Sequence, residues 1–132
     1  LIIDGTYNGE RHKYTTNSGA SISQGISISD ANVRKVTMRN IDVDVFNFYG
    51  AIGVYHPTIG VTVEYENVTH YGKQICHNPS GTIIFLDVTA ESVNLGSAYS
   101  EFAEATRIEV HGALNITHHA TEEVFGFDHN YA

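Results

Sequence analysis

From Lys35 to Val45 the sequence reads KVTMRNIDVDV, and its apolar residues change sides of the chain partway through. Those up to Met38 occupy even positions, whereas those from Ile41 onward occupy odd positions. Side chains on a strand alternate between two faces, so this one-residue shift would turn a flat strand inside out. We therefore expect the strand to bend at Asn40, because asparagine tolerates the left-handed backbone conformation that such a bend requires.

The same shift recurs along the chain. It falls at Asn67 in GVTVEYENVTH, which begins at Gly60, and at Asp87 in GTIIFLDVT, which begins at Gly81. The spacing is 27 positions from residue 40 to residue 67, 20 from 67 to 87, and 28 from 87 to Asn115 in the similar segment LNIT. Around Asn115 the apolar residues keep one parity, so this fourth repeat is imperfect. Periods of this length are typical of solenoids, and they predict an all-β, right-handed parallel β-helix of about five coils.

The alternation of apolar and polar residues also fits an antiparallel sandwich built from hairpins. Its clearest example is Ala20 to Ser29, with isoleucine at positions 22, 26 and 28. Two-residue hairpin turns of the Asn-Gly type occur only once, at Asn8-Gly9, and their scarcity favours parallel coils. Ser97 to Ala105 is the one segment compatible with a helix, but it is too short and too weakly periodic to predict one.

The length and charge of the chain restrict its possible partners. The chain has 132 residues, 42% of them hydrophobic, and a net charge of −8 from 7 Lys+Arg and 15 Asp+Glu. We expect residues 1–132 to form one domain. An acidic surface repels phosphate backbones, and no apolar run approaches the length of about 18 residues that a membrane helix needs, so nucleic acid and membrane insertion are not expected.

The first residues, Leu1-Ile2-Ile3-Asp4-Gly5, already have a strand-like sequence. We therefore expect the domain to be a section of a longer β-helix, truncated at both ends. A truncated solenoid exposes the backbone edges of its end coils, so we expect this section to self-associate or to depend on flanking segments.

The second half of the chain resembles a known family, the pectate-lyase-like adhesive domain of Gram-positive bacterial surface proteins. The segments that carry this resemblance are Glu66-Asn67-Val68-Thr69, Tyr71-Gly72-Lys73-Gln74-Ile75, Asn78-Pro79-Ser80-Gly81-Thr82-Ile83-Ile84-Phe85, Glu101-Phe102-Ala103-Glu104-Ala105, Asn115-Ile116-Thr117 and Val124-Phe125-Gly126-Phe127. The first half fits loosely, through Ile3-Asp4-Gly5 and Asn40-Ile41. The sequence departs from the family after Phe85, where Leu86-Asp87-Val88 stands in place of a turn of small residues with glycine.

This resemblance implies a right-handed β-helix in a large secreted protein attached to the cell wall. It implies adhesion to host or matrix glycans or glycoproteins as the activity, with no catalytic residue, no cofactor and no metal. The ligand-binding residues stay unassigned. The resemblance also places the protein outside the cell, at the cell surface, with its anchor in regions beyond this chain.

Two alternative functions remain open. One is that of a polysaccharide lyase or glycosidase acting on a uronate-containing polymer, and the other is that of a passive stalk, or part of a viral tailspike, that holds other domains away from a surface. Lyases of similar shape hold Ca²⁺ with carboxylates and use a basic residue to abstract a proton. The best candidates here are Asp42 and Asp44, which share a strand face, with Arg39 and Lys35 nearby in sequence. Ca²⁺ needs six to eight oxygen ligands, so two carboxylates on one strand favour a solvated face over a metal site.

Other polar residues have simpler structural interpretations. His118 and His119 are adjacent and would point to opposite faces of a strand, which does not suit a shared metal ion. Cys76 lies beside His77 in no nucleophile motif, so we predict a buried, inert thiol. Asn67-Val68-Thr69 and Asn115-Ile116-Thr117 match the glycosylation sequence, but both fall at predicted turns, which favours a structural role.

Aromatic residues are the candidates for ligand contact. Phe46 and Phe48 have the opposite parity to Val43, so one set is expected to face outward. The others gather near predicted turns, and they are Tyr49, Tyr55, His56, His70 and Tyr71. Rings with polar tips suit stacking and hydrogen bonding to sugars, although β-helices also stack aromatic residues internally.

Overall fold

The computed structural model describes most of the chain in segments. These are residues 1–15, 26–30, 32–44, 49–54, 60–72, 74–77, 81–91, 93–94, 107–117 and 125–126. Several predictions fall outside these residues. They are the segment 97–105, the side chain of Tyr49, and Phe46, Phe48, Tyr55, His56, His118 and His119.

The described residues form strands and no helix. The strands are β1 (Ile2–Asp4), β2 (Thr6–Tyr7), β3 (Glu10–Thr15), β4 (Ile26–Ile28), β5 (Lys35–Asp44), β6 (Tyr49–Val54), β7 (Thr62–Tyr71), β8 (Gln74–His77), β9 (Thr82–Ala90), β10 (Val93–Asn94), β11 (Arg107–Ile116) and β12 (Phe125–Gly126). The prediction of an all-β chain is confirmed for this part of the chain.

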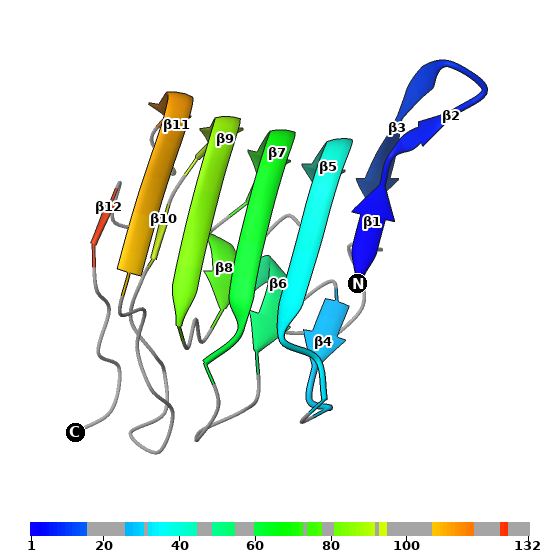
Figure 1. The fold of residues 1–132 in the computed structure, drawn as a ribbon. Helices are drawn as coiled ribbons and strands as arrows, with labels where there is room; N and C mark the ends of the chain where they lie inside the picture. The colour runs from blue at the N-terminus through cyan, green and yellow to red at the C-terminus, as the bar shows by residue number, and fades with distance from the viewer. Residues whose placement is uncertain are drawn as a thin grey trace.

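The long strands lie side by side in one sheet, and the short strands between them in sequence form smaller sheets (Figure 1). The large sheet has the order β11-β9-β7-β5-β3-β2, with β1 also paired to β5. A second sheet has the order β4-β6-β8, and β10 pairs with β12. Among the described strands every pairing is parallel except that of β2 with β3. The antiparallel sandwich is therefore wrong.

The single antiparallel pair is the hairpin at the Asn-Gly dipeptide. Thr6 faces Arg11 and Tyr7 faces Glu10, which leaves a two-residue loop. Asn8 and Gly9 have φ of 51° and 76°, and two positive φ values in such a loop define the hairpin turn that matches the twist of the strands. β2 and the turn lie between β1 and β3 in the chain, and both β1 and β3 pair with β5.

The residues at the three parity shifts adopt the predicted left-handed conformation. Their φ values are 52° at Asn40, 52° at Asn67 and 51° at Asp87. The pairing register between neighbouring strands is the same before and after these residues. All three residues therefore lie in one row across β5, β7 and β9. Each of these residues lies inside an unbroken strand, and the upper ends of the strands curve over behind the sheet in Figure 1. The bend therefore absorbs the shift.

The assignment of the fourth repeat to Asn115 is wrong. Asn115 pairs with Thr89, beyond the bend, and the position in the row of Asp87 belongs to Gly112 and Ala113. Gly112 has φ of 71°, and the N–H of Ala113 donates to Asp87 Oδ1 at 2.9 Å. Two residues stand opposite one here, so the extra residue restores the original parity and hides the shift from the sequence.

The core lies between the large sheet and the second sheet. Inward side chains of β5, β7 and β9 stack in four buried columns across the strands. The columns are Val36, Val63 and Ile83; Met38, Tyr65 and Phe85; Ile41, Val68 and Val88; and Val43, His70 and Ala90. The Tyr65 and Phe85 rings stack with centroids 5.9 Å apart, and the Tyr65 hydroxyl donates to the carbonyl of Ile75 in β8 at 2.9 Å. This bond ties the two sheets together.

The left-handed position at Asn67 gives a test of the bend. We expect Asn67→Val to lower the free energy of unfolding by about 1–2 kcal/mol more than Asn67→Gly does. Both variants lose the same side-chain hydrogen bonds, so the difference isolates the cost of placing a β-branched residue at positive φ. Urea unfolding measures it, and equal stability of the two variants would contradict a left-handed bend at this position.

Candidate functional site

The outward side chains of β1, β3, β5 and β7 form a surface of cross-strand ion pairs, which we call the outer face. Arg39 Nε donates to Asp4 Oδ2 at 2.7 Å, and Lys35 Nζ donates to Glu64 Oε2 at 3.0 Å. A bond from the N–H of Thr6, followed by the bond from Arg39, lowers the pKa of Asp4 to about 2. The opposite charges stand on neighbouring strands, where they offset one another.

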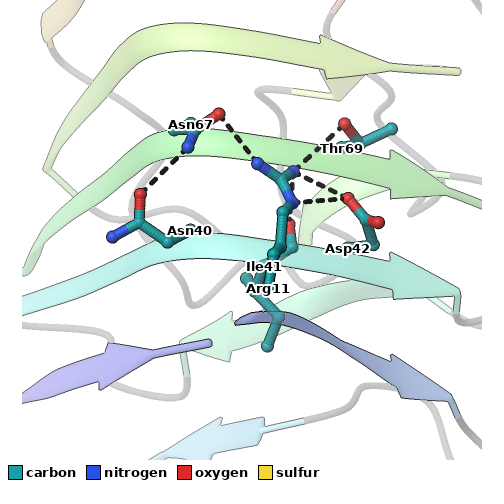
Figure 2. A network of polar contacts seen from close by, with 6 residues as sticks. All are labelled: Arg11, Asn40, Ile41, Asp42, Asn67 and Thr69. Atoms are coloured by element: carbon teal, nitrogen blue, oxygen red, sulfur yellow. Dashed lines mark hydrogen bonds and ion pairs between the residues drawn. The ribbon is translucent and has the colours of Figure 1, made fainter. Parts of the chain in front are cut away.

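Arg11, from the hairpin arm of β3, is the centre of this face (Figure 2). Its Nε donates to Asp42 Oδ1 at 2.9 Å, and its Nη1 donates to Asn67 Oδ1 at 2.8 Å. Its Nη2 donates to the carbonyl of Ile41 at 3.1 Å and to Thr69 Oγ1 at 3.3 Å. One guanidinium thus binds groups on both β5 and β7, which suits its planar set of five N–H donors.

The row of left-handed residues is part of the same network. Asn67 Nδ2 donates to Asn40 Oδ1 at 2.9 Å, and Asn40 Nδ2 donates to Asp4 Oδ1 at 3.3 Å (Figure 2 shows the first of these bonds). The Asn67 amide thus donates to a neighbouring bend and accepts from Arg11. These bonds support the structural interpretation of the Asn67-Val68-Thr69 sequence over the glycosylation one.

Asp42 and Asp44 lie on one face, as their spacing predicts, but their partners differ from the expected ones. Arg11 Nη2 lies 2.7 Å from Asp42 Oδ1, and Lys13 Nζ lies 3.2 Å from Asp44 Oδ2. The basic residues nearest in sequence, Arg39 and Lys35, pair instead with carboxylates on neighbouring strands. The two aspartates are therefore charge-compensated from β3.

Tyr71 is the aromatic residue of the outer face. Its exposed fraction is 44%, and it lies opposite Asp44 in the strand register. Lys13 Nζ stands 5.4 Å from the centroid of its ring, within range of a cation–π interaction. The N–H of the next residue, Gly72, donates to Glu91 Oε2 at 2.6 Å, which fixes the end of β7. We call Lys13, Asp44, Thr69 and Tyr71 the Tyr71 patch.

His70 faces the other way, so its grouping with the ligand-contact aromatics is wrong. Its exposed fraction is 1%, and it lies in the core column between Val43 and Ala90. Within the described part of the chain, neither ring nitrogen has a hydrogen-bond partner. Burial lowers the pKa of His70 to about 3, with a smaller opposing effect of the Asp44 carboxylate. The imidazole is therefore neutral in the folded protein at neutral pH.

We also searched the described residues for a metal site and for a membrane-spanning helix. No group of three or more His, Cys, Asp and Glu side chains in the described segments is gathered so as to hold a metal ion. The same segments contain no helix of the length and apolar character needed to cross a membrane. Cys76 lies in β8, and its predicted burial stays a prediction.

Comparisons with known proteins give no relative for this chain. No family model matches the sequence, and searches of curated proteins and of solved structures likewise find no significant match. The resemblance to the adhesive domain stays a prediction.

Sequence reasoning missed Arg11, which binds four groups on two strands. Its signal was the hairpin segment Thr6-Tyr7-Asn8-Gly9-Glu10-Arg11, in which a tight turn presents a basic residue at the start of a strand. The parity of the chain says which face Arg11 occupies. It does not say that a hairpin arm reaches across β5.

Replacing Arg11 tests the network. We expect Arg11→Met to lower the free energy of unfolding by about 1–2 kcal/mol, because hydrogen bonds to charged groups are lost and Asp42 keeps an uncompensated charge. Lys13→Met is the matched control, since its single ion pair is largely solvated and contributes less than about 1 kcal/mol. Thermal unfolding compares them, and an Arg11→Met protein as stable as the Lys13→Met protein would contradict the bridging role.

The buried imidazole predicts a pH dependence of stability. Burial lowers the pKa of His70 to about 3 in the folded protein, from an ordinary value of 6.5, so between these two values the unfolded chain binds the extra proton. Stability is therefore full above about pH 6.5 and falls as the pH is lowered, by up to about 1.4 kcal/mol per pH unit.

Urea unfolding at several pH values measures this slope. We expect His70→Leu to flatten it between about pH 6.5 and pH 4. His12→Gln, at an exposed position of β3, is the matched control for replacing a histidine. The same slope in the unmodified and His70→Leu proteins would show that the imidazole is not buried in its neutral form.

Proposed function

We propose that this chain forms a right-handed parallel β-helix that acts as a non-catalytic binding module of a bacterial cell-surface protein. Its ligands are host or matrix glycans or glycoproteins, and it contacts them through the Tyr71 patch. The secreted location and wall attachment follow from the resemblance to the adhesive domain, and the choice of contact surface follows from the outer face.

The order of the strands supports the β-helix. Passing from β5 through β6 to β7, and from there through β8 to β9, the chain alternates between the large sheet and the second sheet. Successive long strands are neighbours and successive short strands are neighbours, all parallel. Connections between parallel strands of one sheet are right-handed in nearly all proteins. Counting β1 and β3 as one level, the levels are β1/β3, β5, β7, β9 and β11, in line with about five coils.

The rigid outer face supports a binding role. Arg11 and the cross-strand pairs hold the polar side chains of β5 and β7 in place, so little ordering is needed when a ligand binds. Beside this network Tyr71 offers an exposed ring, and Lys13, Asp44 and Thr69 supply charged and hydroxyl groups around it. An aromatic ring with neighbouring polar groups suits the faces and hydroxyls of a sugar. The exposed ring beside this ordered network is the observation that carries the proposal.

The contacts of the two aspartates favour binding over the lyase or glycosidase alternative. A Ca²⁺-dependent elimination needs free carboxylate oxygens from neighbouring strands. Asp42 and Asp44 instead accept from Arg11 and Lys13, and the next strand places Thr69 and Tyr71 at the matching positions. The cationic partners would have to be displaced before a metal could bind.

The Tyr71 patch is tested by glycan binding. We expect Tyr71→Ala to reduce retention on immobilised mucin and on a glycan array by about tenfold, because it removes the stacking surface. Tyr7→Ala is the matched control, since Tyr7 is an exposed tyrosine on the hairpin, and it should bind as the unmodified protein does.

The same preparations are assayed for cleavage of uronate polymers. Cleavage that is lost in an Asp42→Ala/Asp44→Ala variant would contradict the binding proposal and favour the enzyme. Glycan binding that Tyr71→Ala and Tyr7→Ala leave equally intact would remove the patch as the contact site.

A further inference from the structure

The large sheet ends on one side at β11, a long strand. Among the described strands β11 pairs only with β9, so its other edge has no described partner. Its inward residues Ile108 and Val110 continue the columns of Ile83 and Phe85. Their exposed fractions are 38% and 49%, whereas those of Ile83 and Phe85 are 1% and 0%. The columns therefore end on apolar side chains that no further described strand covers.

The opposite end of the sheet exposes the same columns. Ile3 in β1 lies opposite Met38 and packs against the core, so it starts the column that Val110 ends. The neighbouring Leu1 and Ile2 have exposed fractions of 63% and 61%. Like β11, β1 is parallel to the other long strands of the sheet, so the two edges run in the same direction.

The backbone N–H and C=O groups that point away from the sheet at the two edges are spaced so that they can pair. The carbonyl of Leu1 accepts from the N–H of Thr37 at 2.9 Å, and the N–H of Gly5 donates to Arg39 O at 2.9 Å, so the odd residues of β1 face β5. Alternate residues of a strand direct their backbone groups to opposite sides, so the N–H and C=O of Ile2 and Asp4 face the free edge.

In β11 the N–H of Arg107 donates to Gly81 O at 3.3 Å. The backbone groups of the even residues Ile108 and Val110 therefore face the other free edge. A parallel strand with Ile3 opposite Val110 would place the donors and acceptors of Ile2 and Asp4 against those of Val110. The side-chain columns and the hydrogen-bond phase thus select one register.

The outward charges fit the same register. With Ile3 opposite Val110, the carboxylate of Asp4 would face the imidazole of His111. In the part beyond the bend, continuation of the rows would place Lys13 against the neutral Asn115. No like charges meet in these rows, which removes the usual electrostatic obstacle to edge pairing.

We propose that a second copy of this chain binds at the β11 edge through its own β1 and residues 13–15 of β3, beyond the part of β3 that pairs with β2, head to tail, with Ile3 of one copy opposite Val110 of the other. The contact is heterologous, so it leaves one free edge at each end and continues into open chains of copies. This inference rests on the strand order and the edge residues, and it is independent of glycan binding.

Sedimentation velocity over a range of protein concentrations tests the contact. We expect the unmodified protein to grow beyond the dimer as concentration rises. Val110→Lys blocks the β11 edge with a charge, and Ile2→Pro blocks the β1 edge by removing an N–H that faces away from β5, the described partner of β1. Each variant alone should weaken association by at least about tenfold. Leu86→Lys places a charge at a partly exposed, outward position of the interior strand β9, and this variant should associate as the unmodified protein does.

Mixing the two blocked variants gives the most specific result. Val110→Lys keeps its β1 edge and Ile2→Pro keeps its β11 edge, so an equimolar mixture should form one-to-one dimers and stop there. Circular dichroism and the melting temperature show that each variant is folded, and Val110→Ser serves if the lysine unfolds the chain.

Other outcomes overturn the proposal. A monomer at all concentrations would show that neither edge pairs with another copy. Association lost in Val110→Lys but retained in Ile2→Pro would indicate that two β11 edges pair with each other. Association that Leu86→Lys also abolishes would place the contact on the outward side of the sheet and not at its edges.

Discussion

The left-handed backbone at Asn40, Asn67 and Asp87 is the constraint that gives the rest of the structure its form. A strand without it would present Val36 and Ile41 to opposite faces, and only one could be buried. The positive φ bends each strand and returns the inward parity on the far side, so residues before and after the bend enter one core. Because three neighbouring strands bend at the same row, the parallel pairing continues through the bend.

The outer face depends on the same row. The bend places the Asn40 and Asn67 amides next to each other, where they bond, and Arg11 adds the hairpin to this row through Asn67. The Arg11 contacts with Asp42 and Thr69 then extend the ordered surface toward Tyr71. A structural feature of the backbone thus supports the surface on which ligand binding is proposed. Beneath it lies the buried His70, whose pKa is lowered by burial.

Parity in the sequence was enough to predict the bends at residues 40, 67 and 87, because each leaves a visible shift between apolar residues. It failed at Gly112, where an extra residue compensates the shift and the pattern reads as unbroken. His70 could have been placed inside, since it continues the even parity of Val68, but its polar ring suggested a surface role. The partners of Asp42 and Asp44 were not predictable, because they come from β3, about 30 residues away in the chain, and only the strand register brings them together.

The parallel register across the bends is tested most directly by nuclear Overhauser contacts between the amide and Hα protons of β7 and β9. The structure predicts contacts that keep one direction on both sides of the bend, between Val63 and Ile83 before it and between Val68 and Val88 after it. It also predicts positive-φ coupling constants at Asn67 and Asp87. Contacts that show an antiparallel arrangement of β7 and β9 would contradict the account. So would coupling constants typical of an extended strand at Asn67 and Asp87.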